Sequence, residues 1–478
     1  MRTTNRANGW TAGSDPDHDV RVSSSIPVPR DPSGPEPVTV TEPLDRPEPP
    51  TGPTGAADGS HPVGRPGWMR DVALFLCGQT VSLFGSMLVQ YAVMWHLTLV
   101  TQSGTVLAVS SVVGFQPQAV ISIFGGVWAD RLDRKKLIIG ADATIAATTL
   151  VLALLMMNGA DDLWLIYAAL AIRSAGAGIQ MPAVAALVPQ IVPVDKLMRV
   201  NGINGSIQSA LMLLAPAAAA ALYASWSIVA VFFVDVVTAV LGIGMLLLIA
   251  VPRLVRSQAE PQGYFDDLRG GLRYVVTHTF VRWLLGLYAV VFLLIVAPSY
   301  LTPLMVVRTF GEEVWKLTVT ELAFSIGMML GGAAIAVWGG TRGRMGLILG
   351  STVVFGALSV GMGMSTSMWV FFSLVFLLGL SVPAFSTSSM TILQETVEPE
   401  MQGRVFGFVG IVMAVAMPIG MAIFGPLADR LRVESLLIVA GLALFVVVGL
   451  ALGLPSGRRA IAAAGLHASA GDRGSARP

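Results

Sequence analysis

The chain has 478 residues, of which 54% are hydrophobic and 12% are charged. A soluble globular domain carries about 25% charged residues, so most of this chain is expected to lie in lipid. The formal net charge of +1 argues against the strongly basic surface that nucleic-acid binding requires. The sequence holds one cysteine, Cys77, and no cysteine–histidine cluster, so no disulfide, metal or cofactor is expected.

The two ends of the chain differ in composition from the middle. Residues 1–66 hold 13 of the 28 prolines, many small polar residues and almost no aromatic ones. Such a segment cannot bury enough apolar area to offset its ordering entropy, so it is expected to be a disordered, Pro-rich cytoplasmic tail. Residues 456–478 are similar and are expected to form a second disordered tail.

Twelve apolar runs separate these two ends, each long enough to cross a bilayer core of about 30 Å as a helix of about 20 residues. They cover residues 72–99, 106–129, 137–157, 163–187, 203–223, 227–250, 281–307, 318–338, 346–364, 368–393, 405–425 and 434–454. A spanning β-barrel would need alternating polar residues, so the sequence predicts an all-α membrane protein with twelve transmembrane helices.

Lysine and arginine residues alternate between the loops and predict the orientation. Cytoplasmic loops carry an excess of these residues. One set of loops holds Arg131, Arg134, Lys135, Lys136, Lys196, Arg199, Arg253, Arg256, Arg269, Arg273, Arg342, Arg344 and Arg404. This set is expected to be cytoplasmic, which places both termini inside a multi-pass protein of the cell membrane. Arg430 and Arg432, in the alternate set, are an exception.

The chain is expected to consist of two six-helix bundles, residues 67–251 and 281–455. Between them, residues 252–280 are more polar and predict a cytoplasmic linker with an amphipathic surface helix. A repeat at an offset of about 200 residues supports the division, since Arg199-Val-Asn-Gly202 matches Arg404-Val-Phe-Gly407 and Ala215-Pro216 matches Met417-Pro418. Duplication of a six-helix unit is typical of transporters.

A charged island between two apolar runs carries the most specific pattern. It reads Gly126-Val-Trp-Ala-Asp-Arg-Leu-Asp-Arg-Lys-Lys136 and resembles the loop signature of the major facilitator superfamily. That resemblance implies two pseudo-symmetric bundles around a central cavity. It departs at Asp133, where the signature usually has glycine.

Further motifs resemble the drug:proton antiporter branch that includes macrolide efflux proteins and siderophore exporters. They are Gln79-x-x-Ser-x-x-Gly-Ser86, Arg199-x-Asn-Gly202, Phe233-x-Asp235 and Gly403-Arg-Val-Phe-Gly407. The resemblance implies export of a lipophilic or amphipathic small molecule by alternating access, with protons as the exchanged ion. The four alanines Ala217–Ala220 stand where antiporters often carry further glycines.

Three groups of residues are candidates for the mechanism. The resemblance implies a gate formed by Gly126, Asp130, Arg131, Arg134, Lys135 and Asp142. Ionisable groups inside apolar spans are costly unless paired or facing water, so Arg173, Asp235 and Glu321 are candidates for proton coupling, with Asp235 a possible partner of Arg173. Polar or aromatic residues near mid-helix are candidates for the substrate cavity: Gln90, Tyr91, Gln116, Gln180, Gln208, Phe292, Tyr300 and Phe385.

Helix breaks are expected at Pro117, Pro298, Pro303 and Pro383, where freed backbone groups would face a cavity. The predicted function is that of a monomeric secondary exporter and not an enzyme, since no nucleophile–base pair is visible. Two alternatives remain: a membrane sensor or scaffold without transport, and a uniporter or importer of the same fold.

Overall fold

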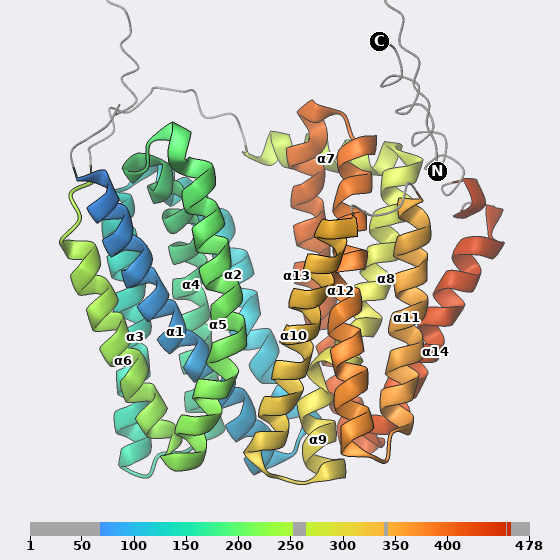
Figure 1. Ribbon diagram of the computed structural model, residues 1–478, viewed down its shortest axis with the longest axis horizontal. Helices are drawn as coiled ribbons and strands as arrows, with labels where there is room; N and C mark the ends of the chain where they lie inside the picture. Colours follow the sequence, from blue (N-terminus) through green and yellow to red (C-terminus); the bar gives the residue numbers. More distant parts are fainter. Residues whose placement is uncertain (1–66, 252–263, 339–342, 456, 460–478) are drawn as a thin grey trace, which may run out of the picture. The chain divides into compact units, whose positions relative to one another are not determined.

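A computed structural model describes residues 67–251, 264–338, 343–455 and 457–459 (Figure 1). The predicted N-terminal tail, residues 252–263 of the predicted linker, and residues 456 and 460–478 of the predicted C-terminal tail lie outside the described residues. The described part falls within one compact unit, Ser60–Pro478. It contains α-helices and one short 3₁₀ helix, and no strand within these ranges.

The first group of helices precedes the linker. It comprises α1 (Trp68–Thr101), α2 (Gly104–Arg131), α3 (Arg134–Met157), α4 (Leu163–Ile191), the 3₁₀ helix η1 (Val194–Lys196), α5 (Leu197–Ser225) and α6 (Ile228–Leu247). Long apolar composition drives these segments into helices, since in lipid each backbone N–H and C=O must find a partner within its own segment.

The second group follows α7 (Tyr264–Thr277). It comprises α8 (Thr279–Tyr300), α9 (Thr302–Phe310), α10 (Val314–Trp338), α11 (Arg344–Met364), α12 (Met368–Thr396), α13 (Pro399–Arg430) and α14 (Val433–Gly453). Helices α8 and α9 together make one span, so the described residues contain twelve candidate membrane spans. The predicted all-α fold with twelve transmembrane helices is confirmed.

The prolines act less uniformly than expected. The seventh span does break between α8 and α9 at Leu301, just after Pro298 and just before Pro303. Helices α2 and α12, by contrast, continue through Pro117 and Pro383. The predicted breaks at those two positions are therefore wrong. Neighbouring helices support a proline-containing helix in a membrane bundle, so loss of one N–H need not end it.

Each group packs mainly within itself. In the first group α2 packs on α4, α1 on α6 and α3 on both α4 and α6, whereas in the second α10 and α11 pack on α12 and α11 on α14 (Figure 1). Glycines allow the closest approaches. A Cβ on Gly125 of α2 would lie 2.6 Å from the carbonyl oxygen of Gly178 on α4, so these two backbones touch directly, as small residues permit between membrane helices.

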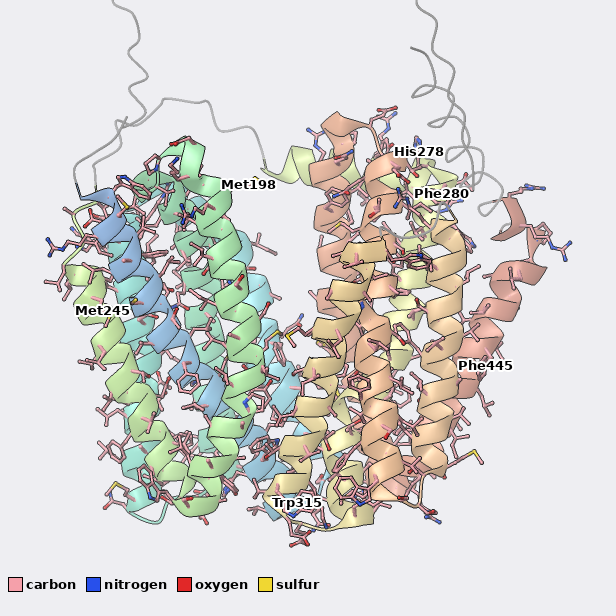
Figure 2. The ribbon with its side chains drawn as sticks, viewed as in Figure 1. Met198, Met245, His278, Phe280, Trp315 and Phe445 are labelled. Carbon is pink, nitrogen blue, oxygen red and sulfur yellow. The ribbon has the colours of Figure 1, made fainter. Side chains whose placement is uncertain are left out.

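The bundle has two ends, which we call the basic face and the opposite face. The basic face carries the α2–α3 loop and η1, and the opposite face carries the α1–α2 and α13–α14 turns. Figure 2 shows Met198, at the basic end of α5, and Trp315, at the opposite end of α10. The chain enters α1 and leaves α14 at the basic face (Figure 1).

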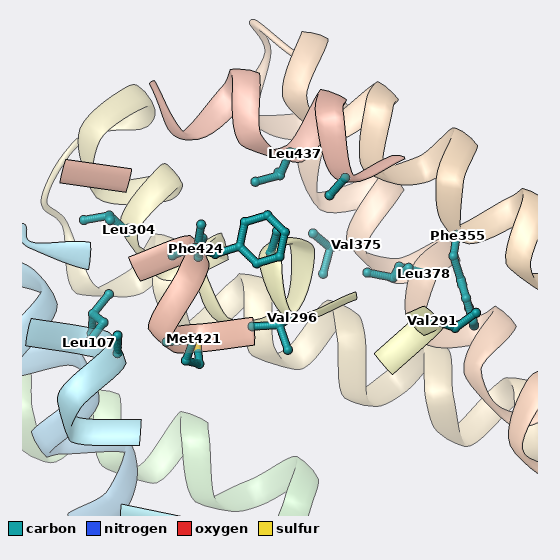
Figure 3. Close-up of a cluster of buried hydrophobic side chains, with 14 of the residues drawn as sticks. Leu107, Val291, Val296, Leu304, Phe355, Val375, Leu378, Met421, Phe424 and Leu437 are labelled. Atoms are coloured by element: carbon teal, nitrogen blue, oxygen red, sulfur yellow. The ribbon is translucent and has the colours of Figure 1, made fainter. Parts of the chain in front are cut away.

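The two groups meet chiefly through α2 with α13 and α5 with α10. The larger apolar core includes residues of both groups, and Figure 3 shows Leu107 of α2 beside Leu304, Met421 and Phe424 of the second group. A smaller core contains first-group residues only, among them Ala129 and Ile138 at the basic ends of α2 and α3. Buried apolar packing thus joins the groups near the opposite face.

Candidate functional site

An ion pair lies buried inside the first group. The Nη1 atom of Arg173 on α4 is 2.5 Å from Oδ2 of Asp235 on α6, and the two side chains are 11% and 1% exposed. The hydroxyl of Thr149 on α3 donates to the same Oδ2 at 2.9 Å and accepts from Arg173. The structure therefore forms the pair that the two intramembrane charges suggested.

A fourth helix completes this network. Ser86 of α1 donates from its hydroxyl to Oδ1 of Asp235 at 3.3 Å. The neighbouring Gly85 lets α1 approach, because a Cβ there would lie 1.9 Å from Oγ1 of Thr238 on α6. The Asp235 side chain thus has a guanidinium and two hydroxyls as hydrogen-bonding partners. Breaking such a buried pair from one side costs about 3–5 kcal/mol.

Asp142, expected in the gate, lies inside the bundle. It sits on α3, is 3% exposed, and accepts a hydrogen bond from Nε2 of Gln180 on α4. Its Oδ2 atom has no hydrogen-bond partner among the described residues. Gln180, expected in the substrate cavity, is therefore engaged within the first group. The pair adds a second buried carboxylate to the same bundle as Asp235.

The basic loop binds helix ends of its own group. Arg134 donates to the carbonyl oxygens of Ala129 at 2.9 Å and of Ala186 at 2.8 Å. Lys135 donates to the carbonyl oxygens of Leu247 at 3.0 Å and Ile249 at 2.7 Å. Cations favour the C-terminal ends of helices, where carbonyls lack intrahelical partners. These residues hold the ends of α2, α4 and α6 together.

The remaining gate residues frame this loop. Asp133 caps α3 by accepting from the backbone N–H of Lys136 at 3.2 Å, so the departure from the usual glycine has a local structural reason. Gly126 lies near the end of α2 with open space beside it, and Arg131 is exposed. The side chain of Asp130 lies outside what the structure describes.

Glu321 occupies a different position from the other charges. It lies on α10, is partly buried, and among the described residues makes no hydrogen bond or ion pair. The phenols of Tyr91 on α1 and Tyr300 on α8 lie within electrostatic range of its carboxylate. Ser325, one turn further along α10, donates at 3.5 Å to a backbone carbonyl of α5. Glu321 therefore faces the first group.

Tyr300 lies where the two groups meet. The Tyr300 ring packs edge-on against Phe115 of α2 at 6.5 Å, and its hydroxyl donates to the sulfur of Met417 at 3.2 Å. Tyr91 packs against Trp95 at 5.8 Å. Of these two predicted cavity residues, Tyr300 makes a ring contact across the two groups, whereas the ring contact of Tyr91 lies within α1.

The other predicted cavity residues are scattered. Phe292 and Phe385 pack against each other at 6.2 Å, and Phe385 also contacts Phe355, inside the second group. Gln90 and Gln208 are exposed, whereas Oε1 of Gln116 is buried without a partner among the described residues. The ring contacts of Phe292 and Phe385 are therefore packing contacts within the second group.

Sequence reasoning missed the hydroxyls that hold Asp235. Thr149 lies seven residues after Asp142, which places both on the buried face of α3. That spacing was the available signal. Ser86 was part of the first-helix motif, but nothing in the sequence linked it to a residue 149 positions away.

These features define a multi-pass membrane transporter: twelve candidate spans in two groups, a buried ion pair within one group, and a charged loop at one face. The chain belongs to the Major Facilitator Superfamily, whose family model matches residues 72–421. The predicted family resemblance is confirmed.

Two similar proteins are named as efflux proteins. Macrolide efflux protein A of Streptococcus pyogenes is 33% identical over 380 residues, which are 78% of this chain and 93% of the relative. Macrolide efflux protein A of Enterococcus faecalis is 34% identical over 317 residues, 65% of this chain and 97% of the relative. Together with the family, they support an efflux role for this chain.

Solved structures share the fold. A bacterial homologue of the human lysosomal transporter Spinster, solved inward-facing and unoccupied, has a TM-score of 0.61 and 12% identity, covering 85% of this chain and 98% of its own. A bacterial homologue of the iron transporter ferroportin, solved inward-facing, has a TM-score of 0.58 and 17% identity, covering 80% of this chain and 98% of its own. At these identities the likeness concerns the fold alone.

Proposed function

We propose that this chain exports a lipophilic or amphipathic small molecule by alternating access, in exchange for protons. The single observation that supports proton exchange is the contact between Arg173 and Asp235, which lies within the membrane-spanning part of the chain. The same proposal places the chain in the cell membrane as a monomer, with its basic face toward the cytoplasm.

Asp235 is the group that takes up and releases the proton in this proposal. In the present arrangement Arg173 and Thr149 stabilise the carboxylate. Protonation removes the negative charge, so Arg173 loses its partner and α4 is freed to move relative to α6. Because a buried, unpaired arginine is costly, the released state favours a rearranged bundle. Proton binding is thereby coupled to helix movement.

The solute binds, in this proposal, where Glu321, Tyr91 and Tyr300 approach one another. Their side chains come from α10, α1 and α8, so movement of one group against the other changes this site. Aromatic rings suit a broad apolar solute. The carboxylate of Glu321, unpaired among the described residues, is the second candidate for the proton or for a polar group of the solute.

The names of the two efflux relatives support the solute class. Both are macrolide efflux proteins, and macrolide-like drugs or siderophores are the solutes that we propose to test first. The loop from Gly126 to Lys135 is proposed as the gate of the basic face.

Transport across inverted membrane vesicles tests the proposal. With an inwardly acidic vesicle lumen, uptake of a fluorescent macrolide should be fast, and a protonophore should reduce it about 10-fold or more, since the gradient supplies the driving force. Asp235→Asn should bind the solute but lose the response to the pH gradient.

Asp161→Asn is the matched control, because Asp161 lies exposed in the α3–α4 turn. It should transport like the parent chain. Uptake that is equally fast with the gradient collapsed would remove proton exchange from the proposal and favour a uniporter.

A further inference from the structure

At the opposite face, the end of α13 binds the beginning of α2. Asp429 accepts from the backbone N–H groups of Gly104 at 2.6 Å and Thr105 at 2.9 Å, and from the hydroxyl of Ser103 at 2.9 Å. These donors are the first residues of α2, whose N–H groups lack intrahelical partners and carry the positive end of the helix dipole. A carboxylate of the second group thus caps a helix of the first.

Arg308 of α9 strengthens this contact. Its guanidinium donates to the carbonyl oxygen of Ala428 at 2.6 Å and to that of Gln102, the C-cap of α1. It also lies 3.4 Å from Asp429. Nearby, Nε2 of Gln102 donates to Glu312 at 2.6 Å. The opposite face is therefore closed by several charge-assisted hydrogen bonds between the two groups.

Glycines allow the helices to meet there. A Cβ on Gly104 would lie 2.3 Å from the carbonyl oxygen of Gly425, and one on Gly425 would lie 2.4 Å from Cβ of Ala108. Neither position accommodates a larger residue while α2 and α13 stay in contact.

The segment around Asp429 is a second copy of the loop motif. Gly425-Pro-Leu-Ala-Asp-Arg-Leu431 matches Gly126-Val-Trp-Ala-Asp-Arg-Leu132 at five of seven positions, with an offset of 299 residues. Each copy ends its helix, α2 at the basic face and α13 at the opposite face. This explains Arg430, which was an exception to the charge pattern of the loops.

The same offset relates glycines in the first turns of the two helices. Gly104, the first residue of α2, corresponds to Gly403, the fifth residue of α13. Gly104 and Gly425 are tightly packed, whereas a Cβ on Gly126 or Gly403 would meet no atom within 4 Å. Gly126 and Gly403 are therefore small enough to allow a close contact between α2 and α13 at the basic face, but they make none in this structure.

We propose that α2 and α13 carry two equivalent latches, one at each face, which close alternately during transport. The Asp429 latch at the opposite face is closed in this structure, with Arg308 as a positioning residue. The latch at the basic face, where Gly126 would meet Gly403, is open. The basic-face half rests on the proposed role of the loop as a gate, whereas the Asp429 half stands independently.

Distances between spin labels on the two groups test the latches. Asp161 and Thr366 are exposed in the α3–α4 and α11–α12 turns of the opposite face. Both would be replaced by labelled cysteines in a Cys77→Ser chain in lipid nanodiscs. Asp429→Asn should raise the ratio of long to short distances about 10-fold or more, the loss expected for hydrogen bonds to a charged group.

Two glycine variants separate sterics from charge. Gly425→Ala leaves every charge in place and should also lengthen the distances. Gly403→Ala, added to Asp429→Asn, obstructs the basic-face latch and should restore short distances. Glu434→Gln and Gly449→Ala are the matched controls. Glu434 binds Thr309 within the second group, and a Cβ on Gly449 meets no atom within 4 Å, so neither should change the distribution.

The proposal is overturned if Asp429→Asn and Gly425→Ala give the same distances as the two controls. If only Gly403→Ala fails to restore short distances, the alternation is overturned and the Asp429 latch alone stands. Neither result depends on whether protons drive transport, so these outcomes are distinct from failure of the proposed function.

Discussion

At the scale of single residues, the sequence singled out Arg173 and Asp235 because isolated charges in apolar spans are costly. The structure explains how both are tolerated: each neutralises the other, and Thr149 and Ser86 satisfy the carboxylate further. The contacts of Asp142 with Gln180 could not be predicted in the same way. Its position one or two turns from the loop suggested the gate, and only the packing of α3 on α4 fixed its partner.

The Arg173–Asp235 pair makes a prediction about stability. Asp235→Asn and Arg173→Gln should each lower the free energy of unfolding by about 3–5 kcal/mol, because each leaves one buried charge without its partner. The double variant should lose clearly less free energy of unfolding than the sum of the losses of the two single variants. Denaturation in detergent would measure all three variants. Additive losses would contradict a direct interaction.

At the scale of helices, close contacts depend on glycines whose importance the apolar pattern does not reveal. Gly125 and Gly114 both lie on α2, yet only Gly125 touches another backbone, that of α4. Apolar length predicted the helices well, because backbone hydrogen bonding in lipid enforces them. Proline effects were predicted less well, because α2 and α12 are supported by neighbours at Pro117 and Pro383.

Gly125→Ala should destabilise the contact between α2 and α4. The added Cβ would lie 2.6 Å from the carbonyl oxygen of Gly178 and 3.3 Å from Pro182, and overpacking of this kind costs about 1–3 kcal/mol. Gly114→Ala is the control, since a Cβ there meets no atom within 4 Å and alanine favours a helix. A thermal unfolding assay in detergent should show a lower midpoint for the first variant alone.

At the scale of the whole molecule, the described residues have their two groups joined at the opposite face, through Asp429, Arg308 and the apolar core around Leu107. The basic residues Arg134 and Lys135 bind carbonyls of their own group. If the basic face is cytoplasmic, as the lysine and arginine pattern predicts, this arrangement is closed toward the outside.

Labelling of single cysteines in intact cells tests that orientation. In a Cys77→Ser chain, Asp161→Cys should react with a membrane-impermeant maleimide, because it lies exposed at the opposite face. Lys136→Cys, exposed at the basic face, should react only after the membrane is permeabilised. The reverse order of reactivity would contradict the orientation.

The sequence by itself determined that the chain is a membrane protein, the number of its spans and its family. These properties follow from apolar length and from local motifs, which need no knowledge of distant contacts. The tertiary structure alone decided which polar residues meet across helices and which face is closed. Residues such as Ser86 and Asp235, or Gly104 and Asp429, are brought together by helix packing. The ends of α2 and α13 carry the same motif, so local sequence does not show at which face the two helices are in contact.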